Sequence, residues 1–173
     1  MQSRVRWLSG TALFCVLAMG LSYLEFLLPL GAVIPIPGFK LGLSNAIIVF
    51  LLHRDRRQAF AVLLGKVALT ALLFGGAMSF VFSLFGGLLS FFGMLALDLL
   101  LGARITDLSL SCAGGVLHNV GQLCAAILFM GGKVLLPYAT PLMLAGLFCG
   151  AVIGLFLNTF SERMTHALAK LRF

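Results

Sequence analysis

Residues Ser111–Gln122 read Ser-Cys-Ala-Gly-Gly-Val-Leu-His-Asn-Val-Gly-Gln, and they lie inside a long apolar run. On a helix this segment would carry a polar stripe. The residues on the stripe are Ser111, Gly115, His118 and Gln122, with Asn119 beside it. Hydrogen-bonding side chains are expensive near the middle of a bilayer, so they face protein or a wet cavity instead of lipid. Two interpretations follow: a polar seam that holds helices together, or the floor of a solute-binding cavity.

The composition places the whole chain among membrane proteins. Hydrophobic residues make up 61% of the 173 residues and charged residues only 10%, whereas a soluble domain carries about 25% charged residues. A membrane-spanning helix needs about 20 residues, so this length accommodates six helices with short loops. We therefore expect an all-α polytopic membrane protein with six transmembrane helices, forming a single integral membrane domain over residues 1–173. The expected spans are 7–28, 41–52, 59–74, 80–101, 108–130 and 142–160.

The basic residues predict the orientation of these spans. With a cytoplasmic N-terminus, most of them would lie on the cytoplasmic side, namely Arg4, Arg6, Arg54, Arg56, Arg57, Arg104, Arg163, Lys170 and Arg172. Lys40 and Lys133 would lie outside, and Lys66 falls within a span. The positive-inside rule then predicts that both termini are cytoplasmic. Because the charges alternate with apolar runs, the expected partner is the lipid bilayer and not a nucleic acid.

Two charged residues fall within the expected spans. Lys66 and Asp98 would lie at comparable depth on neighbouring antiparallel helices, which predicts a buried intramembrane ion pair. In the alternative, Lys66 reaches the membrane interface on its own.

Small residues recur along two of the expected spans. Gly146, Gly150 and Gly154 share one face of the last span, and Ala18 and Ser22 form a shorter version on the first. Small residues at this spacing let helices approach closely. The faces would serve either packing within the chain or the docking of a partner subunit.

Polar residues near the outer ends of the spans extend the cavity interpretation. Glu25, Lys40 and Asn45 are expected near the outer mouth, and Tyr138 in a proline-containing loop could cover it. Together with the polar residues of the fifth span, they would bind a small-molecule solute. The candidate substrate-binding residues are Glu25, Lys40, Asn45, His118, Asn119, Gln122 and Tyr138. For Glu25 and Lys40 the alternative is ordinary anchoring at the membrane interface.

The sequence lacks the residue patterns that several kinds of binding and catalysis require. The sequence has no phosphate-binding Gly-x-x-x-x-Gly-Lys-Ser/Thr segment, and no histidine or cysteine spacing typical of zinc. Holding magnesium on a diphosphate requires clustered carboxylates. The acidic residues are widely separated, at Glu25, Asp55, Asp98, Asp107 and Glu162. We therefore expect no enzymatic activity, no metal and no cofactor.

Four segments carry a resemblance to a known family. They are Pro37-Gly-Phe-Lys-Leu-Gly-Leu-Ser-Asn45, Gly86-Gly-Leu-Leu-Ser-Phe-Phe-Gly-Met94, His118-Asn-Val-Gly-Gln122 and Pro137-Tyr138. In this order they resemble the Gx transporter family, also labelled heptaprenyl diphosphate synthase component I, over roughly residues 22–160. That family looks related to the substrate-binding S components of energy-coupling factor transporters, which are small six-helix proteins that capture vitamins.

The resemblance implies a solute-binding subunit of the bacterial plasma membrane that works with a transmembrane coupling protein and cytoplasmic ATPases. It suggests an isoprenoid or quinone precursor, or a vitamin-like solute, as the substrate. In the alternative, the chain is a non-catalytic membrane accessory subunit or scaffold for a prenyl diphosphate synthase, and recruits an acidic partner through the basic segment Arg54–Arg57. A channel is disfavoured because the sequence has no repeated charges that would form a ring.

Overall fold

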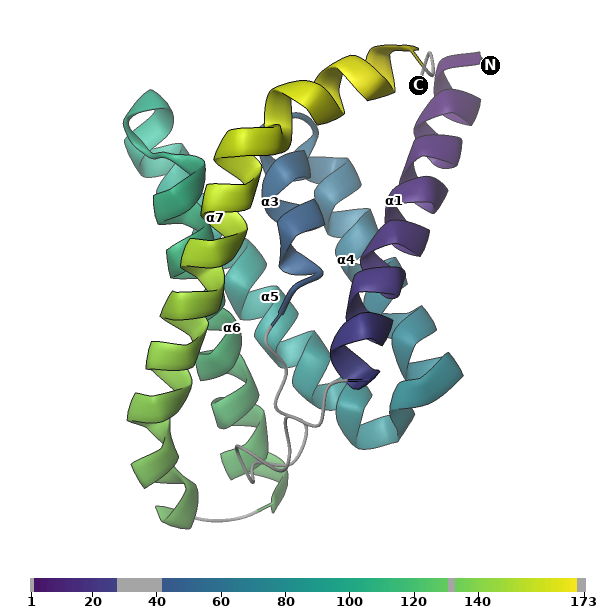
Figure 1. Cartoon of the computed structure of the whole chain (residues 1–173). Helices are drawn as coiled ribbons and strands as arrows, with labels where there is room; N and C mark the ends of the chain where they lie inside the picture. The colour runs from purple at the N-terminus through teal and green to yellow at the C-terminus, as the bar shows by residue number, and fades with distance from the viewer. Residues whose placement is uncertain (1, 28–41, 131–132, 171–173) are drawn as a thin grey trace.

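The computed structural model describes residues 2–27, 42–130 and 133–170, and all regular elements within these ranges are helical. The all-α expectation is therefore confirmed. Figure 1 shows the helices packed in one bundle, with both ends of the chain at the same end of it. The elements are α1 (Gln2–Leu27), α3 (Asn45–Leu52), α4 (Arg56–Thr70), the π-helical turn η1 (Ala71–Gly75), α5 (Gly76–Leu101), the 3₁₀ turn η2 (Gly102–Arg104), α6 (Asp107–Met130), the 3₁₀ segment η3 (Lys133–Tyr138) and α7 (Ala139–Lys170).

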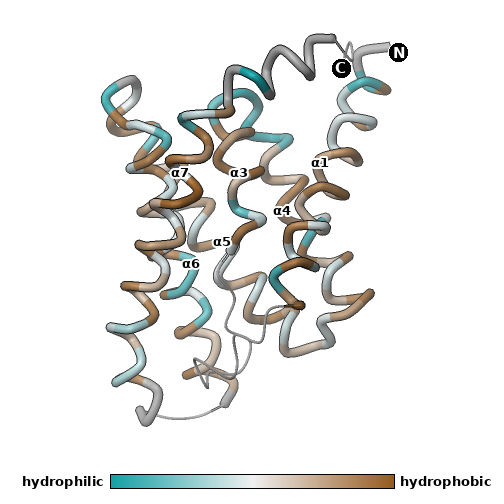
Figure 2. The backbone as a smooth tube through the Cα atoms, viewed as in Figure 1, coloured by the Kyte–Doolittle hydropathy of each residue, from teal (hydrophilic) through white to brown (hydrophobic). Residues whose placement is uncertain are grey.

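The described residues contain four stretches that are long and apolar enough to cross a membrane. They are Arg4–Leu27, Arg56–Leu101, Asp107–Phe129 and Leu136–Phe160. Large apolar side chains are exposed on the outer faces, among them Leu72 at 82% and Phe148 at 71%. Figure 2 shows hydrophobic residues along most of each helix, as expected of a bundle surrounded by lipid. The number of crossings and the side on which the ends lie stay predictions.

The second of these stretches holds two helices. Figure 1 shows α4 and α5 as a hairpin whose turn lies at the end of the bundle opposite the chain ends. Gly76 begins α5 with φ +68°, a left-handed conformation that glycine adopts without steric cost. A charge-free turn with this glycine reverses the chain, so the expected spans 59–74 and 80–101 correspond to α4 with η1 and to α5.

The described part of the expected span 41–52 forms a helix that is too short to cross a membrane by itself. Residue 41 lies outside the described residues, and α3 has only eight residues. A helix of this length spans about 12 Å, against about 30 Å for the hydrocarbon core. A turn precedes α3, in which Asn45 N donates to Gly42 O at 2.8 Å. All residues of α3 except Ala46 are buried, so this short helix is enclosed by its neighbours.

The start of α4 is fixed by a side-chain cap that also binds α1. Asp55 Oδ1 accepts hydrogen bonds from Arg57 N at 2.9 Å and Gln58 N at 3.1 Å. Its other oxygen accepts from Trp7 Nε1 at 2.8 Å. Burial alone would raise the pKa of Asp55, but these hydrogen bonds and the nearby charge of Arg57 outweigh it and lower that pKa. The carboxylate form of Asp55 therefore stabilises the α1–α4 contact.

Both small-residue faces predicted from the sequence lie inside the chain. On α7, a Cβ at Gly146 would lie 2.5 Å from Gly115 O of α6, and the neighbours of Gly150 and Gly154 are also atoms of α6. The backbones of α6 and α7 therefore touch directly, which side chains larger than hydrogen would prevent. On α1, Ala18 is fully buried in the hydrophobic core, and Ser22 is buried as well.

Candidate functional site

A small polar cavity of about 20 Å³ lies inside the bundle. Space of this size holds roughly one water molecule. Its walls come from α1, the turn before α3, α4, α5 and α6, so segments far apart in the sequence meet there. The lining residues are Ser22, Glu25, Gly42, Ser44, Lys66, Thr70, Ser83 and His118. All except glycine carry a polar or ionisable side chain, in contrast to the apolar outer faces of the helices.

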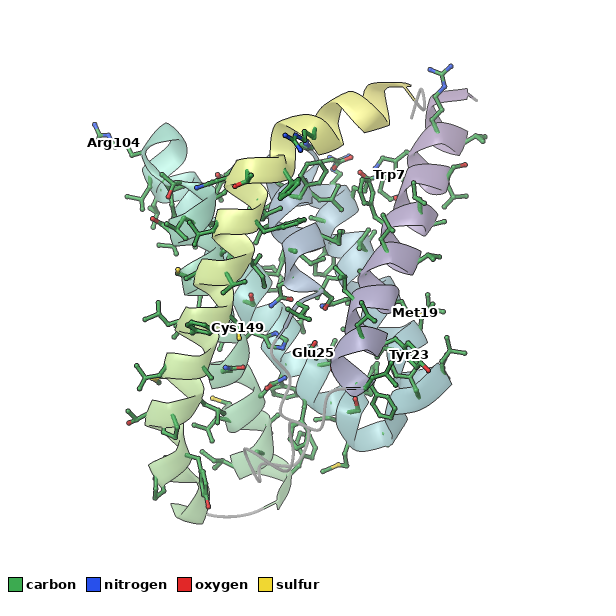
Figure 3. All side chains as sticks on the ribbon, viewed as in Figure 1. Trp7, Met19, Tyr23, Glu25, Arg104 and Cys149 are labelled. Carbon is green, nitrogen blue, oxygen red and sulfur yellow. The ribbon has the colours of Figure 1, made fainter. Side chains whose placement is uncertain are left out.

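Glu25 enters the cavity from the end of α1. Figure 3 shows Glu25 pointing into the bundle, while Tyr23 on the same helix lies on the outer side. Glu25 is 3% exposed, and its Oε1 accepts a hydrogen bond from Gly42 N at 2.6 Å. Gly42 has φ +80°, the left-handed conformation that favours glycine. The carboxylate thus fixes the backbone turn from which α3 starts.

Lys66 approaches the same turn from α4. Its side chain is 5% exposed, and Nζ donates to Ser44 Oγ at 2.5 Å and to Asn45 Oδ1 at 3.3 Å. A buried ammonium requires such hydrogen-bond acceptors because it has lost its hydration. Glu25 and Lys66 therefore place one negative and one positive group at the wall of one cavity, and Asn45 supports Lys66 from α3.

The predicted ion pair between Lys66 and Asp98 is wrong, because Asp98 belongs to a different cluster. Asp98 Oδ2 lies 2.8 Å from Arg56 Nη2, and its Oδ1 lies 3.3 Å from His53 Nδ1. The other nitrogen of His53 lies 3.0 Å from Asp107 Oδ1 on α6. Arg56 precedes Lys66 by almost three helical turns, about 15 Å along α4. Asp98 therefore lies near the end of the bundle that holds the termini, and Lys66 lies deeper.

The polar stripe of α6 divides between the two roles considered for it. His118 lines the cavity, and its Nε2 lies 3.1 Å from Gln122 Nε2. Asn119 contacts α7 instead, where its Nδ2 donates to Leu142 O at 2.7 Å. Gly86 of α5 makes room for this stripe, since a Cβ there would lie 3.0 Å from the His118 ring. His118 thus faces the hollow, while Asn119 helps to hold helices together.

The structure does not place every predicted binding residue at the cavity. Tyr138, at the end of η3, is 36% exposed and is absent from the lining residues. Lys40 lies outside the described residues. Within the described ranges, no three histidine, cysteine or acidic side chains come together in a way that could hold a metal ion.

Three hydroxyl residues of the cavity were missed by sequence reasoning. Ser44 directly precedes Asn45, and Thr70 stands one helical turn after Lys66, so it shares a face with that residue. Ser83 has no such neighbour in the sequence. A search for hydroxyl side chains one turn from a charged residue within an apolar span would have found Thr70.

Comparison with known families supports the resemblance seen in the sequence. A family described as heptaprenyl diphosphate synthase component I matches residues 14–160, which is most of the chain and includes every described cavity residue. Comparisons with curated proteins and with solved structures found no match. On the extent of the family match, this chain belongs to the heptaprenyl diphosphate synthase component I family.

Proposed function

We propose that this chain is the solute-binding membrane subunit of an uptake transporter. The observation that carries the proposal is the polar cavity, whose wall contains Glu25, Lys66 and His118 inside a bundle with a mainly apolar core. Soluble-protein and membrane interiors both penalise buried charge by several kcal/mol per ion. Apolar side chains would pack the same space at less cost, so the retained charges favour a functional role.

The geometry also suits a binding site that is assembled from several helices. The cavity wall takes residues from α1, α4, α5, α6 and the turn before α3, and the short helix α3 begins beside it. In membrane carriers, interrupted or short helices commonly leave polar groups available at mid-depth for a solute. A ligand bound here would contact elements that are distant in the sequence, and would stabilise the bundle as a whole.

Transport against a gradient requires an energy source. The sequence contains no nucleotide-binding phosphate loop. We therefore propose that a separate transmembrane coupling protein and cytoplasmic ATPases supply the energy, as with the S components of energy-coupling factor transporters. An isoprenoid or quinone precursor, or a vitamin-like solute, is the proposed substrate.

Ligand-induced stabilisation tests the binding function. The protein in lipid nanodiscs is screened against vitamins, quinone precursors and isoprenoids by thermal unfolding. A ligand present at 100 times its Kd stabilises the folded state by about 2.7 kcal/mol. Lys66→Met and the milder Ser22→Ala are expected to reduce this stabilisation. Leu155→Ala on the exposed face of α7 is the control, since Leu155 is 58% exposed. The proposal fails if folded protein is stabilised by no compound in the screen.

A second candidate function is a membrane anchor for a prenyl diphosphate synthase. The family description favours it, and so does the end of the bundle that holds the termini. Exposed arginines gather at that end, from α1, the α3–α4 turn, the first turn of α4, η2 and α7: Arg4, Arg6, Arg54, Arg57, Arg104 and Arg163. Co-purification from native membranes separates the candidates, because a coupling protein with ATPases supports transport and a soluble synthase supports anchoring.

A further inference from the structure

The cavity has a wall composition that limits the kind of chemical group it can receive. We propose that it takes a small, net-neutral hydrogen-bonding end of the solute, such as a hydroxyl group, and that Thr70 is the side chain that pairs with this group. The proposal rests on the proposed solute-binding function and specifies the substrate class for that site. It predicts that the site binds a neutral solute more tightly than the phosphorylated form of the same solute.

Thr70 supplies the unused hydrogen-bonding capacity of the cavity. Its side chain lines the space and is 4% exposed. Its Oγ1 has no hydrogen-bond partner among the described residues. A buried polar group without a partner is costly, and a hydroxyl can both donate and accept. A ligand hydroxyl or amide, which also donates and accepts, is the natural complement.

The charges of the cavity wall are already engaged with the protein. Glu25 accepts from Gly42 N, and Lys66 donates to Ser44 and Asn45. One carboxylate and one ammonium at the same wall balance formally. A diphosphate would add at least two negative charges beside Glu25 in a site with little water, where like charges repel strongly. A neutral group adds no such penalty.

The volume of the cavity leads to the same conclusion. About 20 Å³ is available, and one water molecule requires about 10–15 Å³ by this measure. A hydroxyl group, with one oxygen, fits this space. A diphosphate, with two phosphorus atoms and their oxygens, is far larger and would have to separate the helices that form the wall.

Matched pairs of neutral and phosphorylated compounds test the proposal. The pairs are farnesol with farnesyl diphosphate, and pyridoxine with pyridoxine phosphate. Binding to the full chain in nanodiscs of neutral lipid is measured by thermal unfolding over a range of ligand concentrations. For at least one pair, the neutral member is expected to bind at least tenfold more tightly than the phosphorylated member.

Substitutions at Thr70 then test the assigned residue. Thr70→Val keeps the shape of the side chain and removes the hydroxyl, and it is expected to weaken binding of the neutral compound about tenfold. Thr70→Ser retains the hydroxyl and is expected to bind within about threefold of the native protein. Thr159→Val is the matched control, because Thr159 is exposed on α7 and its Oγ1 donates only to Leu155 O of its own helix.

Three results would overturn the inference. Tighter binding of the phosphorylated members refutes the neutral-group assignment and leaves the solute-binding function standing. Unchanged affinity in Thr70→Val refutes the role of Thr70. Absence of binding by all four compounds refutes the substrate class, and the solute-binding function fails with it only if the broader screen also finds no ligand.

Discussion

Replacing Gly146 with alanine is expected to destabilise the bundle at the α6–α7 contact. The added Cβ would lie 2.5 Å from Gly115 O and 2.9 Å from Asn119 Nδ2, whereas ordinary contacts begin at 3.4 Å. Since Gly115 O is a backbone atom, α6 and α7 must separate by roughly 0.9 Å at this point. Overpacking of this kind costs about 1–3 kcal/mol, and the higher helix propensity of alanine offsets up to about 1 kcal/mol.

With the full offset the net loss is up to about 2 kcal/mol, with a further loss of about 1 kcal/mol if the hydrogen bond from Asn119 to Leu142 O is broken. For a chain of this length, each kcal/mol lowers Tm by roughly 2–4 °C. Thermal unfolding in nanodiscs, followed by size-exclusion chromatography of the heated samples, measures the shift.

The control is Gly20→Ala on α1, because a Cβ at Gly20 has nothing within 4 Å. This variant is expected to be as stable as the native protein, or more stable by up to about 1 kcal/mol. Equal Tm values for Gly146→Ala and Gly20→Ala would show that the backbones of α6 and α7 are not in direct contact at Gly146.

Three further predictions concern two acidic side chains, Asp98 and Asp55, and the turn before α3. Asp98→Asn removes the charge that pairs with His53 and Arg56. It is expected to lower the free energy of unfolding by only about 1–3 kcal/mol, because Arg56 is itself half exposed. Asp107→Asn should lower it by less in the same unfolding assay, because the Asp107 side chain is 29% exposed. Asp55 has a lowered pKa in the folded chain, so the stability it contributes is complete above the pKa of the unfolded chain and is lost as pH falls through the folded pKa. The Tm difference between native protein and Asp55→Asn should accordingly shrink on acidification, and a pH-independent difference would contradict the linkage. Gly42→Ala forces alanine to φ +80° with its Cβ 3.0 Å from Asn45 Nδ2, and should lower stability by about 1–2 kcal/mol.

The helical architecture followed from composition because apolar runs of membrane length leave few alternatives to helices. The helix boundaries were harder to predict from the sequence, as α3 shows. Its apolar sequence continues the pattern of a span, but the polar atoms of Ser44 and Asn45 bind Lys66 from α4. This contact joins residues more than twenty positions apart, and hydrophobic periodicity carries no information about it.

The candidate site could be predicted only in part, because it too depends on contacts between distant residues. Glu25 and His118 were identified because an ionisable side chain in an apolar run is conspicuous, and both line the cavity. The pairing of Lys66 with Asp98 was wrong because sequence spacing gave their depths only to within a few residues. Arg56 and His53 lie closer to the helix end and reach Asp98 first. Hydroxyl residues such as Ser83 are frequent in membrane helices, so their presence alone did not mark them as part of a site.

The direct backbone contact of α6 with α7 also bears on how the bundle could change shape. Helices without a layer of side chains between them have little freedom to slide, and they move as one rigid block. Among the described residues, α1 packs mainly on α3 and α4 and touches η1 through Phe74, yet Ser22 and Glu25 of α1 face His118 of α6 across the cavity. Enlargement of the hollow should therefore proceed by α1 swinging away from a stationary α6–α7 block. Spin labels at the exposed positions Leu17 of α1 and Leu147 of α7 would record that swing as a change in a single interhelical distance.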